Sequence, residues 1–125
     1  MQTLNNKSLL VIEPDPSLGR GISHALREMF SEIQHIENPI KAVSKLETNK
    51  FDVIICEICF KTIAGIPLIR LLRRKAPDST ILVLTSDMNQ NIIAALAQCN
   101  VIVIEKPLNI KKLKSCLSKV NMCKP

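Results

Sequence analysis

Four side chains that could do chemistry come directly at the end of short apolar runs in the sequence. They are two acids, a hydroxyl and a lysine: Glu13, Glu57, Thr85 and Lys106. If the runs are parallel strands, these groups meet at one edge of a sheet, where open α/β proteins hold their sites. The sequence therefore predicts a pocket containing two carboxylates, a hydroxyl and an ammonium group. Polar residues also end strands in any soluble protein, so the pattern alone does not define a function.

The runs that must position these groups have the composition of buried strands. Four are continuous and rich in Val and Ile: Leu9–Ile12, Val53–Cys56, Ile81–Leu84 and Val101–Ile104. Continuous apolar runs of this length suit strands that are buried on both faces, as in a parallel sheet. A fifth and weaker candidate, Ile33–Glu37, would suit an edge strand.

Amphipathic stretches with helical spacing fill the gaps between the runs. Asn38 and Asn109 are placed to cap two of these helices, and Pro39 suits a first helical position. The order of elements is then strand and helix repeated five times with short connections. Right-handed crossovers turn this order into an α/β fold with a parallel five-stranded sheet and helices on both faces. We expect one domain over residues 1–125.

The composition is that of a folded domain and excludes several classes of protein. Of the 125 residues, 46% are hydrophobic and 22% are charged, which is unlike a disordered chain. No apolar run is long enough to cross a bilayer, and the first residues lack a secretory pattern. We therefore expect a cytoplasmic protein with no membrane span.

The net charge of +6 lies in the second half of the chain. Residues 66–125 carry 10 Lys and Arg against 3 Asp and Glu. A basic half could meet nucleic acid or an acidic protein surface, although helix faces solvated by lysine explain the spacing equally simply. With no Trp, no Tyr and three Phe, base stacking is poorly supplied, and we expect no direct binding of nucleic acid.

Six segments, taken in order, resemble the receiver domain of bacterial response regulators over nearly the full length of the chain. They correspond to the first strand with its acidic loop, the phosphoacceptor strand, the loop glycine, the third helix, the switch hydroxyl and the pocket lysine: Leu9–Pro16, Phe51–Glu57, Gly65, Ile66–Arg74, Ile81–Ser86 and Glu105–Pro107. The resemblance implies a flavodoxin-like, doubly wound (βα)5 three-layer sandwich with strand order 2-1-3-4-5. It also implies a signalling role in a two-component system and no enzymatic activity.

The chain departs from the family at the residues that perform phosphotransfer. The aspartate that receives the phosphoryl group is replaced by Glu57, whose carboxylate lies one methylene further out. The second acid of the metal-binding pair is Pro14, which has no side-chain oxygen, and the aromatic switch position is Val103. Thr85 and Lys106 are retained. Lys106 could pair with Glu57 and hold the pocket in one state, or both could be residual.

These departures predict an atypical receiver, a pseudo-receiver that acts by phosphorylation-independent contact between proteins. We expect no cofactor and at most weak Mg²⁺ binding, for which Glu13, Asp15 and Glu57 are the weak candidates. One alternative is a phosphorelay receiver that tolerates Glu57. Another is the receiver part of a DNA-binding transcriptional regulator whose output domain lies outside this chain.

The expected partner is a protein, either a histidine kinase or an effector. The apolar surface around Ile92, Ile93 and Leu96, together with the helix Ile110–Val120, would suit a homodimer contact. An alanine-rich helix that is simply packed on the sheet explains these residues as well.

Two other groups of reactive residues carry weaker signals. Cys56 and Cys59 form a C-x-x-C at a strand end, where neither redox nor zinc chemistry is favoured, and the five cysteines are odd in number. We expect free thiols. His24 and His35 are expected to lie away from the strand-end pocket.

Overall fold

The computed structural model describes residues 4–58 and 65–123, in which five strands alternate with five helices. The strands are β1 (Leu4–Ile12), β2 (Phe30–Ile36), β3 (Val53–Glu57), β4 (Thr80–Thr85) and β5 (Ile102–Glu105). The helices are α1 (Pro16–Ala25), α2 (Pro39–Lys45), α3 (Gly65–Lys75), α4 (Gln90–Ala97) and α5 (Ile110–Cys123).

All five strands pair in parallel in one sheet of order β2-β1-β3-β4-β5. This order is the flavodoxin-like arrangement that the sequence predicts. The weaker strand candidate is β2, and it lies at the edge of the sheet as expected. The first strand begins earlier than its apolar run, and its pairing with β2 is irregular between Leu4 and Ser8.

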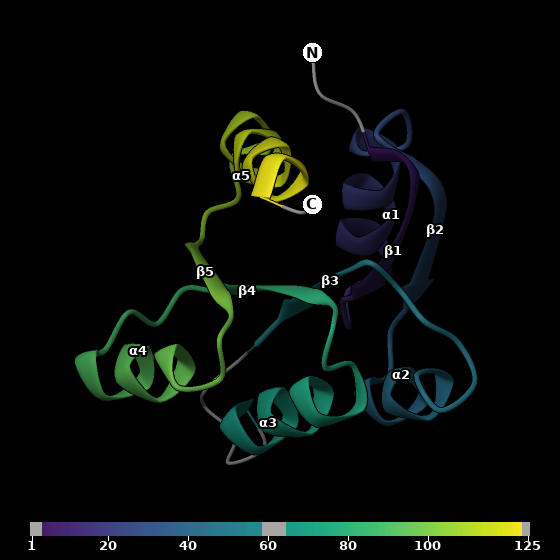
Figure 1. Ribbon diagram of the computed structural model, residues 1–125. Helices are drawn as coiled ribbons and strands as arrows, with labels where there is room; N and C mark the ends of the chain where they lie inside the picture. The colour runs from purple at the N-terminus through teal and green to yellow at the C-terminus, as the bar shows by residue number, and fades with distance from the viewer. Residues whose placement is uncertain (1–3, 59–64, 124–125) are drawn as a thin grey trace.

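The sheet is covered on both faces, which explains why its strands are apolar without alternation. Helices α1 and α5 lie over one face, and α2, α3 and α4 lie over the other (Figure 1). Leu10 and Ile12 belong to the core beneath α2, α3 and α4, whereas Leu9 and Val11 belong to the core beneath α1 and α5. Successive residues of one strand thus enter different cores.

The helix starts follow the caps that the sequence provides. Asn38 accepts hydrogen bonds from the main-chain N–H groups of Ile40 and Lys41, and Pro39 opens α2. Asn109 accepts from Lys112 N at 3.2 Å at the start of α5. Asp15 accepts from Ser17 N and Leu18 N at 2.9 and 3.2 Å, so it caps α1.

A single arginine joins the end of α3 to the segment that follows α4. The half-buried Arg73 guanidinium donates to five main-chain carbonyls, which belong to Ala76, Pro77, Ser79, Cys99 and Asn100, at 2.8–3.2 Å. These carbonyls end α3 and follow α4, so one side chain fixes the two helices relative to β4. Burial lowers the pKa of Arg73.

Helix α4 corrects one part of the homodimer prediction. Leu96 is fully buried in the core, and Ile92 packs against the same cluster. On α5, Leu113 and Leu117 are also fully buried. Leu96 therefore cannot form a contact between two copies, because its side chain is packed in the core of the domain.

Among the residues that the structure describes, no helix is both long and apolar enough to cross a membrane.

Candidate functional site

The carboxyl ends of the strands bring the predicted polar residues together. The parallel register places Ile12 beside Cys56 and Thr85 beside Glu105, so Glu13, Glu57 and Lys106 follow neighbouring positions at one sheet edge. The predicted pocket therefore forms, and two acids and one lysine lie at its centre. The Lys106–Pro107 peptide that follows β5 is cis.

An ion pair between Lys106 and Glu57 occupies the middle of the pocket. The Lys106 Nζ donates to Oε1 of Glu57. The two side chains are 25% and 19% exposed, which is well below the exposure of a surface pair. The carboxylate of Glu57 thus already has a cationic partner from its own chain.

Glu13 is the buried acid of the site, with 2% of its surface exposed. Its Oε2 accepts a hydrogen bond from the main-chain N–H of Asp15 at 3.0 Å, and its Oε1 has no hydrogen-bond donor among the described residues. Burial raises the pKa of Glu13 above its ordinary value of 4.5, and the N–H of Asp15 opposes that change. The charge of Glu57 raises the pKa further and that of Lys106 lowers it.

The raised pKa gives Oε1 of Glu13 a role. A protonated Glu13 can donate a hydrogen bond to the Glu57 carboxylate, and this interaction also raises the pKa of Glu13. Lys106, which pairs with Glu57, brings a positive charge to these two acids.

Asp15 and Pro14, which precede α1, both lie at the surface. Asp15 is exposed, and its Oδ1 serves the first turn of α1. Pro14 is exposed as well and has no side-chain donor or acceptor. Within residues 4–58 and 65–123, no three or more His, Cys, Asp or Glu side chains are grouped as metal ligands.

The hydroxyl of Thr85, which is predicted as the switch hydroxyl, is turned toward its own loop. Thr85 is 1% exposed, and its Oγ1 accepts a hydrogen bond from Asp87 N at 3.0 Å. Val103 pairs with Val83 in the sheet and packs against the core beneath α2, α3 and α4.

Cys56 lies beside this pocket, but its thiol is expected to be unreactive. It is fully buried, and burial raises the pKa of its thiol to about 12, with the nearby charges of Glu57 and Glu13 acting in the same direction. The thiol therefore stays protonated at neutral pH and is a poor nucleophile or metal ligand. Cys59, the other half of the C-x-x-C, lies outside the described residues.

His35 corrects the expectation that both histidines lie away from the site. Its Nε2 is 2.9 Å from the main-chain carbonyl oxygen of Glu13, and its ring rests directly on Gly19 of α1. Because β2 pairs in parallel with β1, His35 lies beside Val11, close to the strand end. The pairing register of β1 and β2 determines the position of His35. The apolar pattern of β2 is too weak for that register to be predicted from the sequence. His24 is exposed on α1, and its side chain makes no hydrogen bond within the described residues.

The fold and the strand-end pocket together define a receiver. The family model of the response regulator receiver domain matches residues 9–118. The chain therefore belongs to the response regulator receiver domain family, whose members are signalling modules of two-component systems.

Solved structures share this fold at low sequence identity. A response regulator from Thermotoga maritima matches with a TM-score of 0.80 and 20% identity, covering 94% of this chain and 98% of that one. A chemotaxis response regulator of Vibrio cholerae gives 0.78 and 21%, covering 94% and 99%. A response regulator protein from Burkholderia pseudomallei, solved with a phosphorylated aspartic acid, calcium ion and citrate, gives 0.75 and 20%, covering 96% and 76%.

Proposed function

We propose that this receiver works without phosphorylation and passes its signal by contact with a partner protein, acting as a signalling module and not as an enzyme. The observation that carries the proposal is Glu57, a longer acid in place of the family aspartate, which is held in an ion pair with Lys106. Its carboxylate lies one methylene beyond the family position, and a misplacement of about 1 Å can cost on the order of 100-fold in rate.

The residues of the pocket do not fit the magnesium ion that phosphotransfer requires. Mg²⁺ demands near-octahedral oxygen ligands, usually with one or two carboxylates of the protein. Pro14 supplies no side-chain oxygen, the carboxylate of Asp15 caps α1, and burial raises the pKa of Glu13. No step of the proposed function runs through a metal.

The switch positions support the same proposal. Thr85 is held by the main chain of Asp87, and Val103 has no ring that could move when the hydroxyl reorients. The domain would then present one conformation to its partner, a histidine kinase or an effector. Regulation would come from the availability of that partner.

Incubation with acetyl phosphate and Mg²⁺, followed by intact-mass measurement, tests the proposal. We expect no phosphoryl adduct on the natural chain. The double variant Pro14→Asp/Glu57→Asp restores both family carboxylates and is expected to gain the adduct, which shows that the conditions suffice. An adduct on the natural chain that Glu57→Gln abolishes would refute the proposal.

The homodimer prediction narrows to the partly exposed residues of α4. Ile92 and Ile93 are half-buried, whereas Leu96 is not accessible. Size-exclusion chromatography with light scattering measures the oligomeric state. If a dimer forms, Ile93→Glu should shift it to monomer, and an unchanged dimer would place the contact elsewhere.

A further inference from the structure

A cationic groove lies between helix α1 and the edge strand β2, and neither residue of the strand-end ion pair is among those that line it. Its volume is about 550 Å³. The lining combines two arginines, two histidines, two serines and two apolar residues: Arg20, Arg27, His24, His35, Ser23, Ser31, Phe30 and Ile33. No acidic residue is among them. We call this feature the α1–β2 groove.

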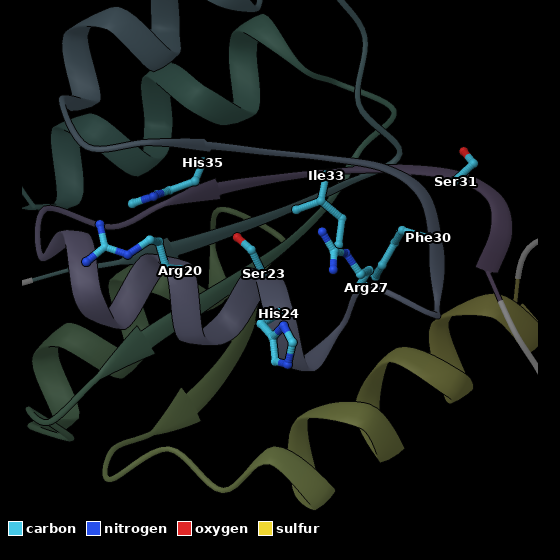
Figure 2. Close-up of a pocket in the computed structure, with 8 residues that line it drawn as sticks. All are labelled: Arg20, Ser23, His24, Arg27, Phe30, Ser31, Ile33 and His35. Carbon is cyan, nitrogen blue, oxygen red and sulfur yellow. The ribbon is translucent and has the colours of Figure 1, made fainter.

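The two arginines mark the length of the groove. In Figure 2 the side chain of Arg20 extends toward His35, while that of Arg27 extends toward Ile33 on the same strand. Arg20 lies within α1, whereas Arg27 lies in the turn that follows the end of α1 at Ala25. An extended segment with several carboxylates can meet both guanidinium groups.

These arginines have few partners within the protein, whereas the serines of the groove are engaged. Arg20 reaches only the Ser17 hydroxyl, at 3.4 Å, and within residues 4–58 and 65–123 neither arginine pairs with an acid. Ser23 Oγ donates to the Gly19 carbonyl at 2.8 Å, and Ser31 Oγ donates to the Lys7 carbonyl at 2.9 Å. The two guanidinium groups and the exposed His24 ring are therefore the groove donors that remain for a ligand.

The edge strand adds a second mode of recognition. In the sheet, β2 pairs with β1 alone, so its outer side presents main-chain N–H and C=O groups without strand partners. An extended peptide can add to such an edge and form main-chain hydrogen bonds along it. Half-buried Ile33 lies on the groove side of this strand and can meet an apolar side chain of the incoming segment.

We propose that the α1–β2 groove binds an acidic, extended segment of a partner protein. The segment adds to the outer edge of β2 and places its carboxylates against Arg20 and Arg27. Nucleic acid is disfavoured because Phe30, the one Phe, Tyr or Trp among the groove residues, is only 6% exposed and offers no stacking surface. The inference does not depend on whether Glu57 accepts a phosphoryl group.

Binding of a fluorescent synthetic peptide of alternating glutamate and valine tests the proposal by anisotropy. The variant Arg20→Gln/Arg27→Gln removes the groove cations, and Arg70→Gln/Arg74→Gln removes the same charge from exposed positions of α3, on the other face of the sheet. We expect the groove variant to weaken binding about 10-fold or more and the α3 variant to change it less than about 2-fold. Equal losses in both variants, or equal binding of a lysine–valine peptide, would overturn the proposal.

Two further measurements separate the proposed occupant from others. Hydrogen exchange of the complex should protect main-chain amides of β2, and binding without that protection would contradict strand addition. A single-stranded oligothymidylate of matched charge should bind more weakly than the acidic peptide. Tighter binding of the oligonucleotide that also requires Arg20 and Arg27 would reassign the groove to nucleic acid. Thermal unfolding of each variant confirms that the fold is intact before binding is compared.

Discussion

Two glycines in the same helix allow a sharp test of how α1 is fitted to the sheet. Gly19 and Gly21 both lie inside α1, and neither has a positive φ. A Cβ added at Gly21 meets nothing within 4 Å, whereas a Cβ added at Gly19 lies 2.7 Å from Cδ2 of His35 and closer still to two other ring atoms. Gly19 is thus required by the close approach of the ring and not by its backbone angles.

The expected difference in stability between the two variants can be estimated because both substitutions gain the same helix propensity. Alanine at either position gains about 0.5–1 kcal/mol from the higher helix propensity. Only Gly19→Ala must also displace the His35 ring, which overpacks the α1–β2 contact and breaks the hydrogen bond to the Glu13 carbonyl. Overpacking of this kind costs about 1–3 kcal/mol. Because the propensity gain cancels, Gly19→Ala should be less stable than Gly21→Ala by about 1–3 kcal/mol.

Urea unfolding followed by far-UV circular dichroism is the suitable assay, since the chain has no Trp or Tyr for intrinsic fluorescence. We expect Gly21→Ala to exceed the natural chain in stability and Gly19→Ala to fall below Gly21→Ala. In a His35→Ala background the ring is absent, and the two glycine substitutions should then have equal effects. Equal stabilities of the two single variants, or a difference that survives in the His35→Ala background, would refute the reasoning.

Three further predictions concern the charged groups. Glu13→Gln should gain stability relative to the natural chain as the pH rises above about 4.5. Because the pKa of Glu13 is raised in the folded state, the unfolded chain releases this proton first, and the natural chain loses stability as the pH rises. The free energy of unfolding, measured between mildly acid and neutral pH, should therefore depend less on pH in the variant. Lys106→Met should destabilise the domain by about 1–3 kcal/mol at neutral pH, since it leaves Glu57 beside a second acid, and adding Glu57→Gln should recover most of the loss in a double-mutant cycle. Arg73→Gln should cost at least about 2 kcal/mol because it gives up several charge-assisted hydrogen bonds to carbonyls, whereas the exposed Arg70→Gln should stay within about 0.5 kcal/mol in the same denaturant titration.

The sequence was sufficient to predict the sheet and the assembly of the pocket, for a reason that lies in the topology. Strands that all run parallel leave all their carboxyl ends at one edge, whichever face the connecting helices cover. Polar residues that follow such strands meet there even when the helices between them are only roughly placed. The pairing of Lys106 with Glu57 follows from this rule, because each comes at or directly after a strand end.

Positions that depend on packing between elements could not be predicted in the same way. Helical spacing indicates that α4 has an apolar face, but it does not tell which of Ile93 and Leu96 the sheet covers. Asp15 could serve either the pocket or the helix start, and local hydrogen bonds to Ser17 and Leu18 decided the matter. The contact of His35 with Glu13 depends on strand register and on a glycine that lies 16 positions earlier in the chain.

The proposed loss of phosphotransfer and the retention of Lys106 then have one physical cause. A pocket with two acids needs two compensating positive charges, or one such charge and one proton. Family members have this lysine and also bind a divalent cation, whereas here Lys106 pairs with Glu57 and burial raises the pKa of Glu13. On this proposal Lys106 is retained because removing it would leave Glu57 without a counter-charge. The same reasoning requires that Glu13 and Lys106 be energetically coupled, so their substitutions should not add: once Glu13→Gln has removed one acid, Lys106→Met should cost measurably less.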